Sequence, residues 1–242
     1  MVAIILAAGH GKRLGGERQK VLRNLLGKPI LAHLLDRVDA LSLERVIIVV
    51  GFEKENVIRE LGGRGVEFVE QPELLGTGDA VKRVRSSLEG YGGDILVLCG
   101  DVPFLRVETL RELLRRHQEG KNACTILTAR VEDPYGYGRI KRQGEDVVDI
   151  VEELNATESE RRIREINSGV YIFHASDLFP ALENVKVNSR KKEYYLTDVV
   201  GILASGKKKI GTYETPFPGE ILGINTQDDF RRAEELLQGS IR

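Results

Sequence analysis

Residues 2–14 read VAIILAAGHGKRL, an apolar run that passes directly into two glycines and two basic residues. The run Val2–Ala7 carries no charge, as is typical of a strand buried on both faces of a parallel sheet. Glycines at the end of such a strand offer backbone N–H groups to phosphate. Four basic residues lie close by: Lys12, Arg13, Arg18 and Lys20. The stretch predicts an α/β fold whose first loop either cradles a polyphosphate or is an ordinary turn with solvated basic side chains.

Two common phosphate motifs do not fit this loop. A dinucleotide fingerprint, G-x-G-x-x-G, matches Gly9 and Gly11 but meets Leu14 where its third glycine belongs. A P-loop, G-x-x-x-x-G-K-[ST], needs glycine in place of Leu6 and Ser or Thr in place of Arg13. The ligand of this loop therefore has to be inferred from the rest of the chain.

The first half of the chain alternates strands with helices. Apolar, β-branched runs predict strands at Val2–Ala7, Val46–Val50, Val66–Val69 and Ile95–Cys99. Helical spacing of apolar residues predicts one helix on Ile30, Leu31, Leu34, Leu35, Val38 and Leu41, and another on Val107, Leu110, Leu113 and Leu114. This alternation predicts a Rossmann-like mixed, mostly parallel sheet with helices on both faces.

The pattern changes after the strand-like run Thr125–Arg130. Two runs flanking RQGE predict an antiparallel pair, and further elements follow. The expected strands are Tyr137–Lys141, Val147–Val151, Ser168–His174 and a short one near Ile221–Ile224, and the expected helices are Thr197–Ser205 and Thr226–Leu237. We interpret the chain as one domain in which a small antiparallel sheet is inserted in the second half, where it covers one wall of the site.

Composition excludes several classes of protein. The 242 residues include 36 Lys and Arg against 37 Asp and Glu, without the basic excess that binding to nucleic acid or a membrane surface needs. Cys99 and Cys124 lie in apolar runs, which favours buried thiols over a disulfide framework or metal cluster. No apolar stretch approaches the ~20 residues of a membrane span, and a strand begins too early to leave room for a signal peptide. We therefore expect a cytoplasmic protein.

Polar residues follow two strands at the predicted ligand-binding edge. Asp101 lies in CGDVPF and Asn225 in LGINTQDDF, and both offer oxygen atoms to a hard cation such as Mg²⁺. Taken alone, each residue is a weak signal of a metal site, because a cap is the more common role for such a residue. Asp101 could cap the turn before Pro103, and Asn225 or Thr226 could cap the final helix.

The stretch EQPELLGTGDA offers Gln71, whose amide could read the edge of a base, followed by Gly76 and Thr77 at a helix start. Small residues there let a ligand approach the backbone, although a loop that needs positive φ has the same composition.

The inserted sheet supplies a backbone amide at Gly138, a carboxylate at Glu152 and an amide at Asn167. This mixture suits sugar hydroxyls and an acetamido group, and a hairpin with solvated polar residues remains the alternative. In KEYYLTD, residues 192–198, we expect helix caps and packed tyrosines. No nucleophilic triad is suggested anywhere, so the expected chemistry needs no protein nucleophile.

Taken in order, these stretches resemble the uridylyltransferase domain of bacterial N-acetylglucosamine-1-phosphate uridylyltransferases. The first stretch, A-A-G-x-G-x-R, is common among nucleotidyltransferases, whereas the ordered set is far more specific. That set comprises QPELLGTGDA, GDVP, DPYGYGRI, IVE, EINSG and EYYLTD, and the similarity runs from ILAAG to GIN. The resemblance implies a nucleotide-diphospho-sugar transferase fold over 1–242, with a nucleotide-binding half at about 1–130, a sugar-binding half at about 131–225 and a C-terminal helix at 226–242.

The resemblance also implies residue roles. Nucleotide contacts are expected from Leu6, Ala7, Ala8, Gly9, Lys20, Gln71, Gly76, Thr77, Cys99, Gly100 and Asp101. Sugar contacts are expected from Gly138, Glu152, Asn167 and Asn225. Arg13 and Lys20 are the expected catalytic cations, and Asp101 and Asn225 the expected ligands of the Mg²⁺ cofactor.

The chain departs from the family pattern in several places. Gln19 precedes the lysine where the family usually has proline, which we expect to change only the stiffness of the loop. After Glu152 the family often has charged residues including Lys and Asp, whereas Glu153, Leu154 and Asn155 follow here. The hexapeptide repeats of the family's acetyltransferase β-helix are absent, so acetyl transfer is not expected, and the trimer built by that half is not carried over.

The implied substrates are UTP and N-acetylglucosamine 1-phosphate, and the products are pyrophosphate and UDP-N-acetylglucosamine, a peptidoglycan precursor used in cell wall biogenesis. The sugar phosphate would attack the α-phosphorus in line, without a general base or a covalent enzyme intermediate. Two alternatives stay open: another sugar-1-phosphate nucleotidyltransferase of the same fold, and a non-catalytic nucleotide-sugar sensor. A nicotinamide dehydrogenase is disfavoured by Leu14.

Overall fold

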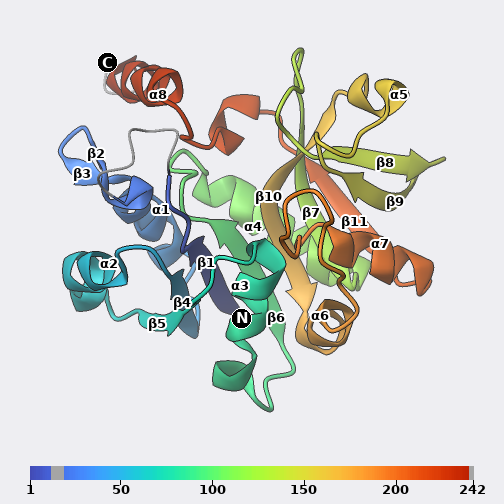
Figure 1. The fold of residues 1–242 in the computed structure, drawn as a ribbon, viewed down its shortest axis with the longest axis horizontal. Helices are drawn as coiled ribbons and strands as arrows, with labels where there is room; N and C mark the ends of the chain where they lie inside the picture. Colours follow the sequence, from blue (N-terminus) through green and yellow to red (C-terminus); the bar gives the residue numbers. More distant parts are fainter. Residues whose placement is uncertain (12–18, 240–242) are drawn as a thin grey trace.

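The computed structural model describes residues 1–11 and 19–239 (Figure 1). Its main sheet has the strand order β11-β7-β10-β6-β1-β4-β5, with the β8–β9 pair attached to β10, and β2 and β3 form a separate two-stranded sheet. The strands are β1 (Val2–Ala7), β2 (Asn24–Leu25), β3 (Lys28–Pro29), β4 (Arg45–Val50), β5 (Glu67–Glu70), β6 (Asp94–Cys99), β7 (Cys124–Arg130), β8 (Arg139–Gln143), β9 (Asp146–Val151), β10 (Glu165–His174) and β11 (Ile210–Glu214).

The helices are α1 (Ile30–Asp39), α2 (Lys54–Leu61), α3 (Thr77–Arg83), α4 (Val107–Gly120), α5 (Glu158–Arg161), α6 (Ala175–Leu182), α7 (Asp198–Ser205) and α8 (Gln227–Gly239). Short 3-10 helices cover Lys20–Leu22, Gly62–Arg64, Arg85–Leu88 and Pro218–Ile221. None of the helices in the described ranges combines the length and apolar character that a membrane span requires.

The centre of the sheet is parallel. Ile4 of β1 pairs with Ile47 of β4 on one side and with Val97 of β6 on the other, and all three are fully buried. The carboxyl ends of these strands therefore meet at one edge, where open α/β sheets bind ligands. β10 runs antiparallel between β6 and β7, with Tyr171 opposite Val97, so its amino-terminal end reaches the same edge.

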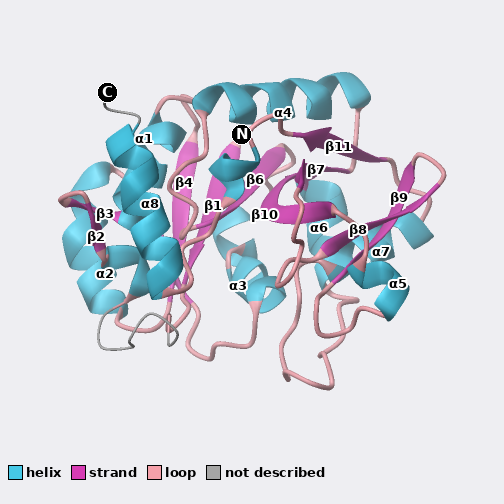
Figure 2. Ribbon diagram, turned by 90° about the horizontal axis from the view of Figure 1, so that it is seen from above, coloured by secondary structure: helices cyan, strands magenta, loops and turns pink. Residues whose placement is uncertain are grey.

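Each face of the sheet carries its own core. Ile4 packs into the core that contains residues of α3, α6 and α7, and Ile5 packs into the core with residues of α1, α2 and α4. Figure 2 shows α4 and α3 on opposite sides of the strands. Successive residues of β1 enter the cores on opposite faces, which confirms the predicted mixed sheet covered on both faces.

The predicted antiparallel pair in the second half is confirmed as β8 and β9, with Ile140 opposite Ile150. The pair is joined to the main sheet, because Arg139 of β8 pairs with Ile166 of β10. The inserted strands thus extend the main sheet beside the amino-terminal end of β10.

One expected strand is wrong, and one strand was missed. No strand forms near Ile221–Ile224: a 3-10 helix begins at Pro218, and the two isoleucines are buried by packing rather than by pairing in a sheet. Ile221 packs in the core with residues of α1 and α4, and Ile224 packs with residues of α1 and α8. The last strand is β11, which pairs parallel with β7 at the sheet edge. Its residues are only half-buried, so its sequence lacks a continuous apolar run.

Candidate active site

A cleft of about 630 Å³ opens at the carboxyl edge of the central strands. Most of the predicted nucleotide-site residues line it: Leu6, Ala7, Ala8, Gly9, Lys20, Gln71, Gly76, Thr77, Cys99 and Asp101, together with Glu152 from the predicted sugar site. The sequence did not single out the other lining residues as ligands: His10, Val21, Leu74, Ala80, Glu193 and Tyr195. Arg13 lies outside the described residues. A larger cavity of about 1060 Å³ between α3 and α6 contains none of the predicted site residues.

Lys20 joins three segments that are far apart in the sequence, because its side chain contacts both Asp101 and Asn225. Its Nζ lies 2.5 Å from Asp101 Oδ2 and donates a 3.0 Å hydrogen bond to Asn225 Oδ1. Asn225 does not line the cleft itself but is joined to it through this contact. The capping alternatives do not account for either side chain. The Asp101 carboxylate faces Lys20, and it is the Thr226 hydroxyl that accepts a 3.1 Å hydrogen bond from the Asp229 N–H at the start of α8.

The fit of Asp101 and Asn225 to Mg²⁺ follows from the same contacts. Two oxygen atoms from separate loops already share one cationic partner, so both can face a single cation. Within residues 1–11 and 19–239 no cluster of three or more His, Cys, Asp or Glu side chains is placed to hold a metal. One carboxylate and one amide oxygen suit Mg²⁺, because it keeps several waters and takes its remaining ligands from substrate phosphates.

The backbone around Gly100 belongs to the same edge. Its N–H donates to the Leu6 carbonyl over 2.9 Å and continues the ladder between β1 and β6 past the end of the strands. Burial raises the pKa of the neighbouring Cys99 thiol to about 12, so the thiol stays protonated at neutral pH. Cys99 is therefore a lining group and is not activated as a nucleophile.

Gln71 is held in a fixed orientation. Its Nε2 donates to the Gly76 carbonyl over 2.9 Å and to Asp79 Oδ2 over 2.8 Å, and Asp79 also pairs with Arg83 at 3.1 Å. With both amide hydrogens used, Oε1 is the atom through which Gln71 can bind a further group, as an acceptor. Asp79 was missed from the sequence, since its partner lies eight residues away across a loop.

The glycines of this loop are required by close packing. Gly76 has φ of +101°, and a Cβ there would lie 2.5 Å from the Tyr194 carbonyl oxygen. The Gly78 N–H donates to that same carbonyl over 2.8 Å, and the Thr77 hydroxyl accepts from the Leu196 N–H over 3.0 Å. The sequence predicts either a positive φ or an approaching ligand at this loop, and the structure shows the positive φ.

Glu152 enters the cleft from the end of β9, and Thr197 supports it from the start of α7. The Thr197 hydroxyl donates a 2.9 Å hydrogen bond to Glu152 Oε1. Burial raises the pKa of Glu152, and this hydrogen bond opposes the rise. Thr197 occupies the N-cap position expected from the sequence, but its side chain caps no N–H of the helix.

Gly138 and Asn167 are neighbours although 29 positions separate them, because the Asn167 N–H donates to the Gly138 carbonyl over 2.8 Å. The Asn167 side chain is fixed at both ends: Oδ1 accepts from the Gly169 N–H and Nδ2 donates to the Tyr171 hydroxyl over 2.6 Å. Gly169 has φ of +77° and lies at an irregularity in the pairing of β10 with β7. Neither Gly138 nor Asn167 lines the cleft.

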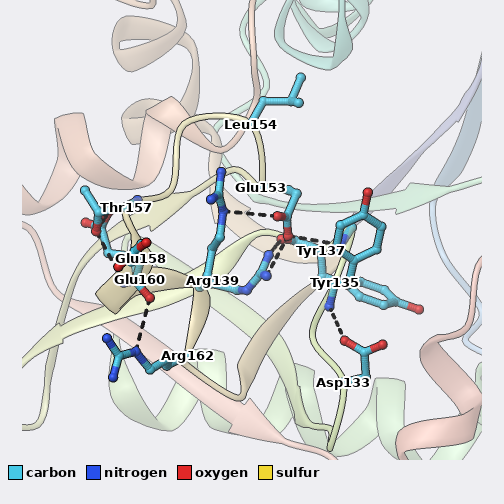
Figure 3. Close-up of polar contacts among 12 residues, drawn as sticks. Asp133, Tyr135, Tyr137, Arg139, Glu153, Leu154, Thr157, Glu158, Glu160 and Arg162 are labelled. Atoms are coloured by element: carbon cyan, nitrogen blue, oxygen red, sulfur yellow. Dashed lines mark hydrogen bonds and ion pairs between the residues drawn. The ribbon is translucent and has the colours of Figure 1, made fainter.

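Glu153, where the chain departs from the family pattern after Glu152, has a structural role that the sequence did not reveal. Figure 3 shows Glu153 between Arg139 and the loop that carries Tyr135 and Tyr137. Glu153 Oε2 lies 2.6 Å from the buried Arg139 guanidinium and accepts the Gly136 N–H over 3.1 Å. Glu153 therefore ties DPYGYG to the end of β9, beside Gly138.

The other departure, Gln19, is fully buried. Its N–H donates to Glu53 Oε2 over 2.5 Å, and its Nε2 donates to the carbonyls of Ala7 and Phe52 over 2.8 and 3.2 Å. The expectation that this residue changes only loop stiffness is incomplete, because its amide also joins the segment before Lys20 to the ends of β1 and β4.

Comparison with known proteins adds to this geometry. The curated relatives include bifunctional GlmU proteins from Listeria innocua and Streptococcus mutans, each 42% identical over 240 residues, which is 99% of this chain. The chain spans 52% of the length of these relatives.

Solved structures with the same fold include UDP-glucose pyrophosphorylase bound to UDP-glucose, with a TM-score of 0.78 at 18% identity over 99% of this chain and 98% of that one. Another is a Bacillus anthracis protein described as a glucose-1-phosphate thymidylyltransferase, with a TM-score of 0.77 at 21% identity over 98% of this chain and 95% of that one. The family model for the MobA-like NTP transferase domain matches residues 3–196. This chain therefore belongs to the MobA-like NTP transferase family.

Proposed function

We propose that this chain transfers the uridylyl group of UTP to N-acetylglucosamine 1-phosphate, releasing UDP-N-acetylglucosamine and pyrophosphate in the cytoplasm. One observation carries the proposal: Lys20, Asp101 and Asn225 converge at the cleft that Gln71, Gly76 and Thr77 also reach. The 42% identity to GlmU proteins over nearly the whole chain supports the choice of these substrates.

The nucleotide is assigned to the β1 side of the cleft. The segment Leu6–Gly9 and the loop at Gly76 and Thr77 would pack against the uridine, and Gln71 Oε1 would accept its imide N–H. Cys99 and Gly100 would complete this wall through the backbone. Cys99 has a small side chain and Gly100 has none, which leaves room for a base beside the sheet.

The sugar is assigned to the wall between β9 and β10. Glu152 would accept hydrogen bonds from sugar hydroxyls, which its buried carboxylate can do strongly once ionised. Gly138 and Asn167 are placed side by side by their backbone hydrogen bond, so one amino sugar could meet both.

Charge neutralisation would drive the chemistry. Asp101 and Asn225 would hold Mg²⁺, which supplies stabilisation of the charge that develops on the phosphates during in-line attack. Lys20, with Arg13, would bind the triphosphate and orient it toward the sugar phosphate. The attacking phosphate oxygen is already ionised near neutral pH, so no side chain has to remove a proton.

The test is pyrophosphate release from UTP and N-acetylglucosamine 1-phosphate, with and without Mg²⁺. Lys20→Ala and Asp101→Ala should each lower kcat by about 100-fold, whereas Lys208→Ala should leave it unchanged because Lys208 pairs with Asp177 outside the cleft. Thermal unfolding of each variant checks that the fold is kept. Wild-type turnover in both site variants would show that the roles are misassigned.

The same assay separates the alternatives. A panel of nucleoside triphosphates and sugar 1-phosphates would identify a different transferase of this fold. Tight binding of UDP-N-acetylglucosamine without any pyrophosphate release would identify a sensor.

A further inference from the structure

Packing around its backbone fixes the position of Lys20. Lys20 opens a 3-10 helix whose Val21 and Leu22 are buried in the core beneath α1. Gly11 has φ of +59°, and a Cβ there would lie only 2.5 Å from Lys20 Cβ. The preceding Gln19 is tied to the strand ends as described above. The chain therefore delivers the lysine side chain to one place at the cleft rather than leaving it free in solvent.

At that place the ammonium has two oxygen partners and is only slightly exposed to solvent. The side chains of Lys20 and Asp101 are only 15% and 16% exposed, so their contact at 2.5 Å is largely shielded from solvent. Asn225 Oδ1 completes the group at 3.0 Å. The oxygen atoms that would ligate Mg²⁺ are thus the same atoms that hold the ammonium of Lys20.

We propose that Lys20 occupies the cation position in the free protein and must leave it before a divalent metal binds, so that metal and nucleotide bind as a coupled pair. The inference rests on the proposed function, because it takes Asp101 and Asn225 as the metal ligands. It adds a regulation of the site that the proposed reaction does not require: the free protein excludes the metal.

Electrostatics sets the direction of the coupling. A divalent ion beside Asp101 would place three positive charges within a few ångströms of one another, which is unfavourable in a shielded cleft. Moving the lysine away without a new partner would leave a partly buried ammonium unpaired, which is also costly. A triphosphate removes both penalties, because its oxygens accept the ammonium and add negative charge beside the metal. By linkage, the metal then raises the affinity for the nucleotide to the same extent.

The test measures metal binding without turnover. Mn²⁺ is titrated into the nucleotide-free protein at fixed ionic strength, and free Mn²⁺ is measured by its electron paramagnetic resonance signal. Lys20→Met keeps an unbranched side chain of similar length and removes the charge. This variant should bind Mn²⁺ at least about tenfold more tightly than wild type. Lys208→Met is the matched control: Lys208 pairs with Asp177 at 2.7 Å away from the cleft, and its variant should match wild type.

A double variant, Lys20→Met with Asp101→Asn, locates the effect, because it should return to weak binding if Asp101 is the carboxylate that Lys20 shields. Equal Mn²⁺ affinity in wild type and Lys20→Met would overturn the inference. Tight binding that survives the Asp101 change would overturn it as well, by placing the metal elsewhere. Failure of the proposed function would look different: the wild-type protein would release no pyrophosphate, whatever the Mn²⁺ titrations give.

Discussion

Thr197 and Glu152 are joined by a 2.9 Å hydrogen bond that connects the first turn of α7 to the end of β9. Thr197 is 5% exposed, so the bond lies in a region where an unpaired carboxylate oxygen would be expensive. A residue that the sequence pattern assigns to helix capping therefore serves the cleft instead.

Thr197→Val should weaken binding of the sugar phosphate while leaving UTP binding intact. The valine keeps the volume but removes the donor, and loss of a hydrogen bond to a charged group raises KM for the sugar phosphate about tenfold. Without the donor the pKa of Glu152 rises further, so the acid limb of the kcat/KM profile for the sugar phosphate should move to higher pH. Thr197→Ser, which keeps the hydroxyl, should restore both values. An unchanged profile in the valine variant would contradict a positioning role.

Gly76→Ala should destabilise the fold by about 3 kcal/mol. The new Cβ would meet the Tyr194 carbonyl oxygen at 2.5 Å and Glu193 Cβ at 2.9 Å, at a backbone angle that alanine rarely adopts. Urea unfolding measures the loss. The matched control is Gly63→Ala, where nothing lies within 4 Å and φ is not positive. Similar losses for the two variants would argue against the packing explanation.

Gln19→Pro should destabilise the protein even though the backbone of Gln19, with φ of −50° and ψ of 123°, is one that proline accepts. The change removes the N–H donated to Glu53 and both amide contacts to the carbonyls of Ala7 and Phe52. The net loss should be about 1–3 kcal/mol in urea unfolding, after the gain from a stiffer unfolded chain. Gln19→Leu keeps the backbone N–H donor but loses the side-chain amide, so its stability should lie between those of wild type and the proline variant. A proline variant as stable as wild type would show that these contacts contribute no more than the stiffening of the unfolded chain.

Asp198 should make stability depend on pH. Burial, with Asp149 and Glu152 nearby, raises the pKa of Asp198 to about 6, above the value of about 4 in an unfolded chain. Below pH 4 both states hold the proton and there is no penalty. As the pH rises from 4 to 6 only the unfolded state ionises, so the folded state loses stability over this range, and the loss is complete above pH 6, where both states are ionised.

Asp198→Asn should therefore gain on the order of 1 kcal/mol over wild type between pH 4 and pH 8, a figure discounted because Asp198 is only partly buried and solvent screens its charge. Urea unfolding at pH 4, 6 and 8 checks the slope. Asp228→Asn is the control for removing one negative charge, since Asp228 is an exposed carboxylate. A stability difference independent of pH would exclude a titrating Asp198.

The buried centre of the fold is predictable because burial on both faces dictates composition. The runs Val2–Ala7 and Ile95–Cys99 match β1 and β6 to within one residue. β11 was not predicted, because this edge strand is only half-buried and therefore needs no continuous apolar run. The false strand at 221–224 shows the converse: buried isoleucines mark packing, and only pairing partners distinguish a strand from a turn.

In the site, too, some features can be predicted from the local sequence and others cannot. The positions of Asp101 and Gln71 are readable because polar residues after buried strands are unusual. Their partners are not readable, since Lys20 is 81 positions from Asp101 and 205 from Asn225. Contacts such as these depend on how the loops close in three dimensions, and no local pattern encodes that.

β10 runs antiparallel to β6 and β7, so the chain between β7 and β10 can vary during evolution without disturbing the central strands. The chain leaves β7 and returns in β10 at the same edge of the sheet, so residues 131–164 form an excursion whose two ends lie side by side. Its length and sequence can vary without shifting the register of β1, β4 and β6. Under the proposed function this excursion carries Gly138 and Glu152 of the sugar site, whereas β1 and β6 carry the nucleotide side of the cleft, so the excursion is the unit to graft between relatives when a new sugar specificity is sought.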